Sequence, residues 1–296
     1  MFDNILGNDN IKRQLKQAVD LNKTSHSYLF LGISGIGKKM IAKEFAKMIL
    51  CESSEKYCNQ CKSCIEFDSN NNPDFFLIEP DGTSIKIDQI RQMQKKIIEA
   101  PIISNNKVYI IDDADLMTTE AQNCLLKTLE EPPESVTIIL IGSKENSFLS
   151  TIKSRCTIIK FQPIENEQIK EYLRKKYNEE DIPEEMLNIY EGSIGKAEDL
   201  KDKKEIFLKI IQILENIKIL DLPEIFKKAD VIYKSQEDKN DILEAINVIL
   251  FKMSIEDIRY LKCIDIVEDT VKRLNANANY NMSIDNMLFR IWEEMH

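Results

Sequence analysis

The sequence predicts an α/β domain, in which a parallel sheet is covered by helices, followed by an all-helical region. Five short apolar runs alternate with segments of helical periodicity in the first 162 residues, a pattern typical of a parallel sheet covered on both faces. From about Lys203 to His296 the chain has no glycine, and apolar residues recur at helix spacing among many charges. The five apolar runs are residues 28–31, 75–78, 107–111, 136–141 and 157–161.

The composition indicates a folded protein of two or three domains. A chain of 296 residues exceeds a typical single domain, and 43% hydrophobic with 30% charged residues is an ordinary globular balance. The net charge of −10 argues against broad, charge-driven wrapping of nucleic acid. No segment approaches the roughly 20 apolar residues of a membrane helix, and Met1–Lys12 lacks the runs of a signal peptide. We therefore expect a cytoplasmic protein with no membrane partner.

A helix is expected before the first apolar run, with Ile11, Leu15 and Val19 on one face and a cap from Asn8 or Asp9. Helical patterns also follow the second and third apolar runs, at about residues 87–99 and 121–131. Prolines directly after these patterns end them. These helices would cover the predicted sheet.

A phosphate-binding loop follows the first apolar run. The order strand, G-x-x-x-x-G-K, helix is that of a P-loop, whose glycines let successive N–H groups point at phosphates. The start of the helix favours anions, and Lys38 adds a mobile positive charge. We therefore expect weak binding of ATP or ADP. The expected binding residues in this loop are Gly32, Gly35, Ile36, Gly37, Lys38 and Lys39.

The last position of the loop departs from the usual pattern. A serine or threonine hydroxyl coordinates Mg²⁺ there in hydrolysing proteins, but this chain has Lys39. A protonated ammonium has no lone pair to offer a metal. The loop is therefore expected to hold a nucleotide and to hydrolyse it poorly.

Four of the seven cysteines cluster after the P-loop helix. Cys58, Cys61 and Cys64 have two residues between neighbours, and Cys51 lies seven positions upstream of the first. In a reducing cytosol such a cluster indicates a metal site rather than a disulfide framework. With no histidine nearby, we expect an all-thiolate structural Zn²⁺ site at residues 51–64. Unpaired structural cysteines are the alternative, which the regular spacing disfavours.

Acidic residues end the third apolar run. Lys107–Asp113 is an apolar strand ending in two aspartates, as in a Walker B element, where Asp112 would hold Mg²⁺ through water. Asp113 takes the place of the usual glutamate and is one methylene shorter, so catalytic use is doubtful. A strand that merely stops at a polar surface is the alternative. Ser143, just after residues 136–141, lies where a polar residue would sense the nucleotide.

Several motifs occur in a characteristic order. They are Ser25-His-Ser-Tyr-Leu-Phe-Leu-Gly32, the P-loop, the four cysteines, Ile110-Ile-Asp-Asp-Ala-Asp115, Leu125-Leu-Lys-Thr-Leu-Glu-Glu-Pro-Pro133 and Ser154-Arg-Cys156. This series closely resembles the bacterial clamp-loader AAA+ subunits of DNA polymerase III. The resemblance covers about the first 200 residues, and the rest matches only as a helical region of suitable length.

The resemblance implies three domains. They would be an AAA+ P-loop domain at 1–162 carrying the zinc module, a small helical lid at 163–204, and a helical collar at 205–296 that holds a five-subunit ring together. The partners would be gamma/tau and delta subunits, the sliding clamp and, indirectly, primed DNA. Arg155 would be an arginine finger acting in trans on a neighbour's ATP. Lys196 replaces a lid arginine that normally meets the subunit's own nucleotide.

Three functional hypotheses follow. Two are roles within such a ring, and the third is a function outside it. The first is a largely non-hydrolysing stator, not itself a polymerase and at most a weak ATPase, which lends Arg155 to a motor subunit. The second is a gamma/tau-like motor, which Lys39, Asp113 and Lys196 each weaken. The third is a zinc-dependent nucleic-acid-binding module, disfavoured by the acidic balance and by the lack of aromatic clusters near the cysteines.

Overall fold

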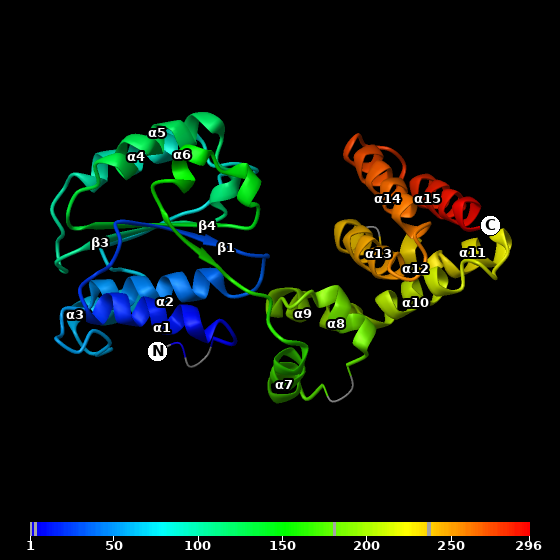
Figure 1. Cartoon of the computed structure of the whole chain (residues 1–296), viewed down its shortest axis with the longest axis horizontal. Helices are drawn as coiled ribbons and strands as arrows, with labels where there is room; N and C mark the ends of the chain where they lie inside the picture. The colour runs from blue at the N-terminus through cyan, green and yellow to red at the C-terminus, as the bar shows by residue number, and fades with distance from the viewer. Residues whose placement is uncertain (1, 3–4, 180–181, 236–237) are drawn as a thin grey trace. The chain divides into compact units, whose positions relative to one another are not determined.

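The chain divides into two compact units. The computed structural model describes residues 2, 5–179, 182–235 and 238–296 (Figure 1). The first unit, called the sheet unit here, comprises Met1–Gln168 with Ser193–Gly195, and the second, the helical unit, comprises Ile169–Gly192 with Lys196–His296. The further division of the helical part at residue 204 stays a prediction.

The sheet unit contains the five predicted strands in one parallel sheet. In sheet order they are β2 (Phe75–Ile78), β3 (Lys107–Ile111), β4 (Val136–Gly142), β1 (Ser27–Leu31) and β5 (Thr157–Lys160). Leu29 of β1 aligns with Leu140 of β4 on one side and with Ile158 of β5 on the other. Because every pairing is parallel, all five strands end at the same edge of the sheet. The predicted α/β fold is confirmed.

Helices cover both faces of the sheet (Figure 1). Successive strand residues point to opposite faces, so Tyr28 and Phe30 enter one core while Leu29 and Leu31 enter the other. The first core lies under α1 (Asp9–Asp20) and α2 (Lys38–Leu50). The second lies under α4 (Ile87–Ile97), α5 (Thr119–Glu130) and α6 (Ser150–Lys153). The short α3 (Lys62–Asp68), η1 (Ala114–Leu116) and η2 (Glu145–Ser147) complete the unit.

The expected side-chain cap of α1 is wrong. Asn8 does occupy the N-cap position, but it adopts a left-handed conformation with φ of 54° and makes no side-chain cap. Its amide instead bonds the backbone of Gln162, donating to the carbonyl at 3.1 Å and accepting from the N–H at 2.9 Å. Asn8 therefore ties the start of the unit to the segment after β5.

The helical unit is built from amphipathic helices around an apolar core. Its fully buried residues include Phe207, Ile246, Val267 and Ile284. The last three helices of the chain, within residues 239–295, pack in succession through such residues. The helices after β5 are α7 (Asn166–Tyr177), α8 (Glu184–Tyr190), α9 (Ile194–Leu200), η3 (Lys201–Lys203), α10 (Lys204–Glu215), α11 (Leu222–Lys228), α12 (Asp230–Tyr233), α13 (Lys239–Met253), α14 (Tyr260–Asn275) and α15 (Tyr280–Met295).

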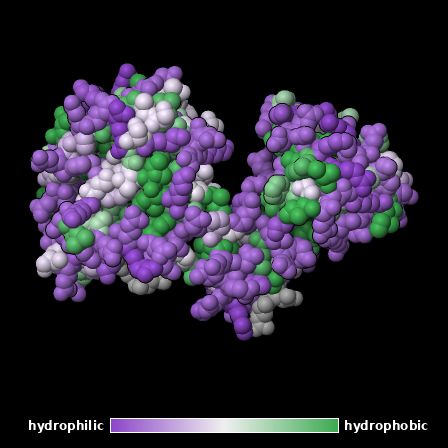
Figure 2. Space-filling view, viewed as in Figure 1, coloured by the Kyte–Doolittle hydropathy of each residue, from purple (hydrophilic) through white to green (hydrophobic). Residues whose placement is uncertain are grey.

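Hydrophilic residues cover most of the visible face of each unit, with apolar residues gathered in a few groups (Figure 2). The helical unit exposes several large apolar side chains, including Ile219, Phe251, Ile255 and Ile258. Among the residues that the structure describes, no helix has the length and apolar character needed to cross a membrane.

Candidate functional site

The loop after β1 has the backbone of a phosphate cradle. Gly35 and Gly37 have φ of +75° and +91°, in the left-handed region that favours glycine. A Cβ on Gly35 would lie 2.3 Å from Ser193 Oγ, because residues 193–195 pack directly on the loop. There the N–H of Gly195 donates to the Gly35 carbonyl at 2.9 Å. The loop is thus held by a second segment of the same unit and leads into α2 at Lys38.

Two of the predicted loop residues serve close packing. A Cβ on Gly32 would lie 2.6 Å from Ile36 Cδ1 and 2.9 Å from Phe161 Cβ. The Ile36 side chain is buried in the core between the sheet and α2. Only the backbone of these two residues is therefore available to a ligand.

Lys38 lies folded back over the loop. Its ammonium donates to the carbonyls of Gly32 at 2.6 Å and Ile33 at 2.7 Å, and it lies 3.4 Å from Ser143 Oγ. The structure therefore brings together Lys38 and Ser143, which the sequence placed separately. Burial lowers the pKa of Lys38, and the nearby carboxylates of η1 and the end of β3 offset part of this.

Lys39 is bound by two carboxylates. Its Nζ lies 2.8 Å from Asp112 Oδ2 and 2.6 Å from Glu79 Oε1. Burial lowers the pKa of Lys39, but these two hydrogen bonds outweigh it and leave the pKa raised. Glu79 was not among the expected site residues. The available signal was its place directly after residues 75–78, since β2 pairs with β3 and both strands end at the same edge.

Asp113 and Asp115 add negative charge beside this pair. Asp113 has φ of 47°, and burial, then Asp112 and Asp115, raises the pKa of its carboxyl. Asp115 accepts a hydrogen bond from the N–H of Lys144 at 3.3 Å. Sequence reasoning missed Asp115, although it is the third carboxylate in four residues after β3. Its charge also bears on Lys38.

These residues do not fit the Mg²⁺ ion that a P-loop usually holds. Mg²⁺ takes oxygen ligands in near-ideal octahedral geometry. The position of the usual hydroxyl carries an ammonium, and that ammonium already occupies the Asp112 carboxylate. What the arrangement can offer a phosphate is a glycine cradle, a helix start and two lysines.

Arg155 lies at the opposite edge of the sheet. Its carbonyl accepts a hydrogen bond from the hydroxyl of Ser27, the first residue of β1, at 2.7 Å. The P-loop begins after the last residue of β1, and a five-residue strand spans about 13 Å at its usual rise. The half-exposed guanidinium bonds Glu130 Oε1 at 2.7 Å and the Thr151 carbonyl at 3.0 Å.

Lys196 belongs to the helical unit. Its ammonium lies 2.6 Å from both Glu191 Oε2 and Glu244 Oε1. Burial lowers the pKa of Lys196, and these two hydrogen bonds outweigh it and raise the pKa overall. Its carboxylate partners come from the residue after α8 and from α13.

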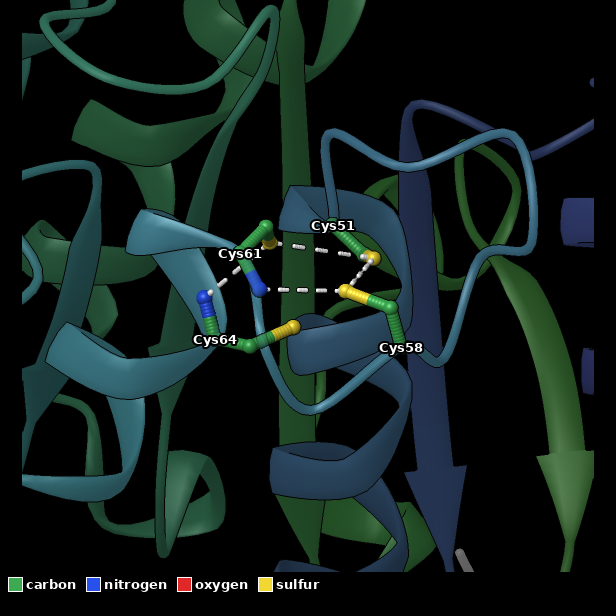
Figure 3. Close-up of side chains that lie close together, drawn as sticks. All are labelled: Cys51, Cys58, Cys61 and Cys64. Atoms are coloured by element: carbon green, nitrogen blue, oxygen red, sulfur yellow. Dashed lines mark hydrogen bonds between the residues drawn. The ribbon is translucent and has the colours of Figure 1, made fainter.

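The four predicted cysteines converge (Figure 3). Their sulfur atoms all lie within 4.8 Å of one another. Cys51 Sγ is 3.5 Å from Cys58 Sγ and 4.0 Å from Cys61 Sγ. Zn–S bonds of about 2.3 Å in a tetrahedron place sulfurs about 3.8 Å apart, so the cluster has the size of a Cys₄ zinc site. The donor set therefore fits Zn²⁺.

The pKa values of the thiols in the cluster are shifted in different directions. Hydrogen bonds from the N–H groups of Gln60 and Cys61 lower the pKa of the Cys58 thiol to about 6. Burial raises the pKa of Cys51 and Cys64. Because neighbouring thiolates repel one another, a divalent cation is what would let all four sulfurs ionise together.

Buried polar residues attach the cysteine segment to the sheet unit. Ser63 Oγ, two residues after Cys61, lies 2.9 Å from Ser104 Oγ and accepts from the Asn72 amide at 2.9 Å. Ser104 also donates to the Leu50 carbonyl at 2.9 Å, next to Cys51. The cluster therefore has a fixed position between α2 and α3.

A five-stranded parallel sheet with a P-loop after β1 and carboxylates after β3 defines the class: the sheet unit is an AAA+ P-loop domain, followed here by helices. The chain belongs to the family described as "DNA polymerase III, delta subunit", whose model matches residues 7–165. The match confirms the family resemblance seen in the sequence motifs.

Two curated relatives illustrate this membership. The chain is 38% identical to DNA polymerase III subunit delta' of Bacillus subtilis over 164 residues, which cover 55% of this chain and 50% of the relative. It is 34% identical to subunit tau of the same organism over 265 residues, covering 84% of this chain and 46% of the relative. The chain thus spans about half the length of the curated relatives it matches.

A solved structure supports the fold alone. The DNA polymerase III gamma subunit-related protein of Thermotoga maritima has a TM-score of 0.50 and 21% identity, with 96% of this chain and 100% of that chain covered. Because relatives of both the delta' and the tau kind match, the choice between stator and motor depends on the residues of the site.

Proposed function

We propose that this chain is a delta-prime-type subunit of the DNA polymerase III clamp loader. It would act as a largely non-hydrolysing stator that helps load the sliding clamp on primed DNA and donates Arg155 to a neighbouring ATPase subunit. The observation that carries this proposal is the ion pair of Lys39 with Asp112, at 2.8 Å.

With this ion pair, neither of the two usual protein groups is free to hold a catalytic metal ion. ATP hydrolysis by P-loop proteins uses Mg²⁺ held by the loop hydroxyl and the Walker B aspartate. In this chain the hydroxyl is replaced by Lys39, and the aspartate is bonded to that same side chain. Asp113, which would polarise the attacking water, is one methylene shorter than the usual glutamate. Its own ATP turnover is therefore expected to be slight.

The position of Arg155 supports a role in trans, on a nucleotide bound by an adjoining subunit. Its backbone is bonded to the first residue of β1, whereas the P-loop follows the last residue of that strand. A guanidinium at that edge is far from the chain's own phosphate cradle and half exposed. A phosphate bound by an adjoining subunit is the ligand such a group would reach.

The remaining features are proposed to serve assembly. The Cys₄ cluster would hold a structural Zn²⁺, since four protein ligands leave no open position for water. The exposed apolar residues of the helical unit, such as Ile255 and Ile258, would contact gamma/tau and delta subunits in a hetero-pentamer. We would expect such a subunit in the cytoplasm, with ATP or ADP held weakly in the cradle.

The alternative is a gamma/tau-like motor. Its support is the match to subunit tau over 84% of this chain and the retained cradle glycines. Steady-state ATP turnover by the purified chain, beside a Lys38→Ala variant, separates the two roles. Background turnover in both proteins is expected. Substantial turnover that Lys38→Ala abolishes would overturn the stator and favour the motor.

A further inference from the structure

We infer that the Lys39 ammonium takes the place of the divalent metal ion in this site, so that the chain binds nucleotide phosphates without Mg²⁺. The inference rests on the proposed function only in treating the loop from Gly35 to Lys38 as the phosphate cradle. It goes further by assigning the charge that completes that cradle to a side chain of the protein itself.

The first step is the position of the ammonium. Lys39 is the second residue of α2, at the point of the loop where a metal-binding hydroxyl usually stands. Its Nζ lies 2.8 Å from Asp112 Oδ2, the oxygen source that would otherwise serve the metal. The ammonium therefore binds the same carboxylate that a Mg²⁺ ion would need.

The second step is that two strands contribute to the contact. Glu79 follows β2 and Asp112 follows β3, so the two carboxylates come from neighbouring strands. Both form ion pairs with Lys39 Nζ, and the distance to Glu79 Oε1 is 2.6 Å. Both hydrogen bonds are charge-assisted and short. They hold the head of a long side chain that is only partly exposed, at 39%. The ammonium is thus positioned by the fold rather than free to sample the solvent.

The third step is hydrogen-bonding capacity. A lysine ammonium has three N–H donors, and Asp112 and Glu79 account for two of them. One donor remains for a phosphate oxygen. P-loops carry the lysine equivalent to Lys38 beside Mg²⁺. Lys39 therefore supplies one positive charge where Mg²⁺ would supply two.

The fourth step is competition. A Mg²⁺ ion held by Asp112 would lie beside the Lys39 ammonium, a like charge that is already bonded to Oδ2 of the same carboxylate. Mg²⁺ also gives up its water shell reluctantly and gains no loop hydroxyl in exchange. The hydrogen bonds from both carboxylates raise the pKa of Lys39, so the side chain is charged at neutral pH. Added Mg²⁺ therefore has little to contribute.

The test is the affinity of the full chain for ADP, measured by calorimetry in excess Mg²⁺ and again in EDTA. The wild-type dissociation constants should agree within about twofold. Lys39→Thr restores the hydroxyl and frees Asp112, so Mg²⁺ should now tighten binding by about 10-fold, the worth of one charge-assisted contact. Lys39→Met keeps the length without the charge, and its binding should be about 10-fold weaker in both buffers.

Lys47→Thr is the matched control, because Lys47 lies on the same helix and forms an ion pair of the same kind, 2.7 Å from Asp68. It should bind ADP like the wild type in both buffers. Circular dichroism of each variant checks that the fold is retained.

The inference would be overturned by wild-type binding that Mg²⁺ strengthens 10-fold or more, by no measurable binding in either buffer, or by wild-type affinity in Lys39→Met. These readouts concern binding alone. A chain that needs Mg²⁺ to bind ADP yet does not hydrolyse ATP would sink this inference and leave the proposed function standing.

Discussion

Arg155 and Glu130 form an ion pair, with Nη2 2.7 Å from Oε1, that joins the segment before β5 to the last residue of α5. The Thr151 carbonyl accepts a second bond from the same guanidinium at 3.0 Å. Both contacts lie at the edge of the sheet where the strands begin. Arg155 is therefore oriented by surface contacts and not by burial in the core.

This orientation predicts that Arg155 can be altered without harm to the fold. Glu130→Ala and Arg155→Ala should each change the free energy of unfolding by less than about 1 kcal/mol, because exposed ion pairs contribute little. Urea denaturation of the full chain measures this. A loss of more than about 2 kcal/mol would make Arg155 a structural residue instead.

The packing of residues 193–195 on the P-loop predicts that a side chain at position 35 destabilises the fold. Gly35 and Gly82 have nearly the same φ, +75° and +70°, but a Cβ on Gly82 has no atom within 4 Å whereas one on Gly35 meets Ser193 Oγ at 2.3 Å. Gly82→Ala should cost about 1 kcal/mol, the strain of a left-handed residue. Gly35→Ala should cost about 2 kcal/mol or more and weaken ADP binding. Equal losses in urea denaturation would contradict the packing argument.

The cysteine cluster predicts about one Zn²⁺ per chain. Cys61→Ser should abolish the zinc content and destabilise the sheet unit, because metal binding and folding of the segment are coupled. Cys124→Ser is the control, since Cys124 lies on α5 and donates to Gln94 Oε1 at 3.3 Å. Elemental analysis after dialysis measures the content. Zinc retained in Cys61→Ser, or lost equally in Cys124→Ser, would refute the site.

Glu198 predicts an acid sensitivity of the helical unit. Burial raises its pKa, but hydrogen bonds from Lys176, Tyr172 and Tyr177 outweigh this and lower the pKa to about 2. Since the folded pKa lies below the unfolded value of 4.5, the stabilisation is present above pH 4.5 and is lost as the pH falls towards 2.

Glu198→Ala should therefore cost about 1 kcal/mol at pH 7 and progressively less below pH 4.5. The fluorescence of Trp292 reports this unfolding, because it is the one tryptophan of the chain and lies on α15. A difference between variant and wild type that stays constant from pH 7 to 3 would count against the assignment.

The features that depend on a local residue pattern could be predicted from the sequence. The five strands are short, mostly apolar runs, and the P-loop and the cysteines have fixed spacing, so each could be located without knowledge of tertiary contacts. Glu79 could not be assigned, because its role depends on β2 lying beside β3. Asn8 was misjudged for the same reason, since its amide prefers the backbone of Gln162 to the start of its own helix.

The presence of Lys39 in the loop was visible from the sequence, but its partners were not. An ammonium in that position could have pointed into solvent and left Asp112 free. Only the three-dimensional arrangement gives the distances of 2.8 and 2.6 Å to carboxylates from two strands. The contacts from which we infer weak hydrolysis are therefore visible only in the tertiary structure.

The central claim is that this chain assists the ATPase of a neighbour through Arg155. Its most direct test is ATP turnover by a clamp loader reconstituted with Arg155→Ala, beside Arg91→Ala as an exposed arginine on α4 that pairs only with Asp88 among the described residues. An arginine finger is worth about 10³-fold or more in rate at its site. We predict that Arg155→Ala assembles normally but loses turnover at the adjoining site, while Arg91→Ala matches the wild type. Undiminished turnover with Arg155→Ala would contradict the account.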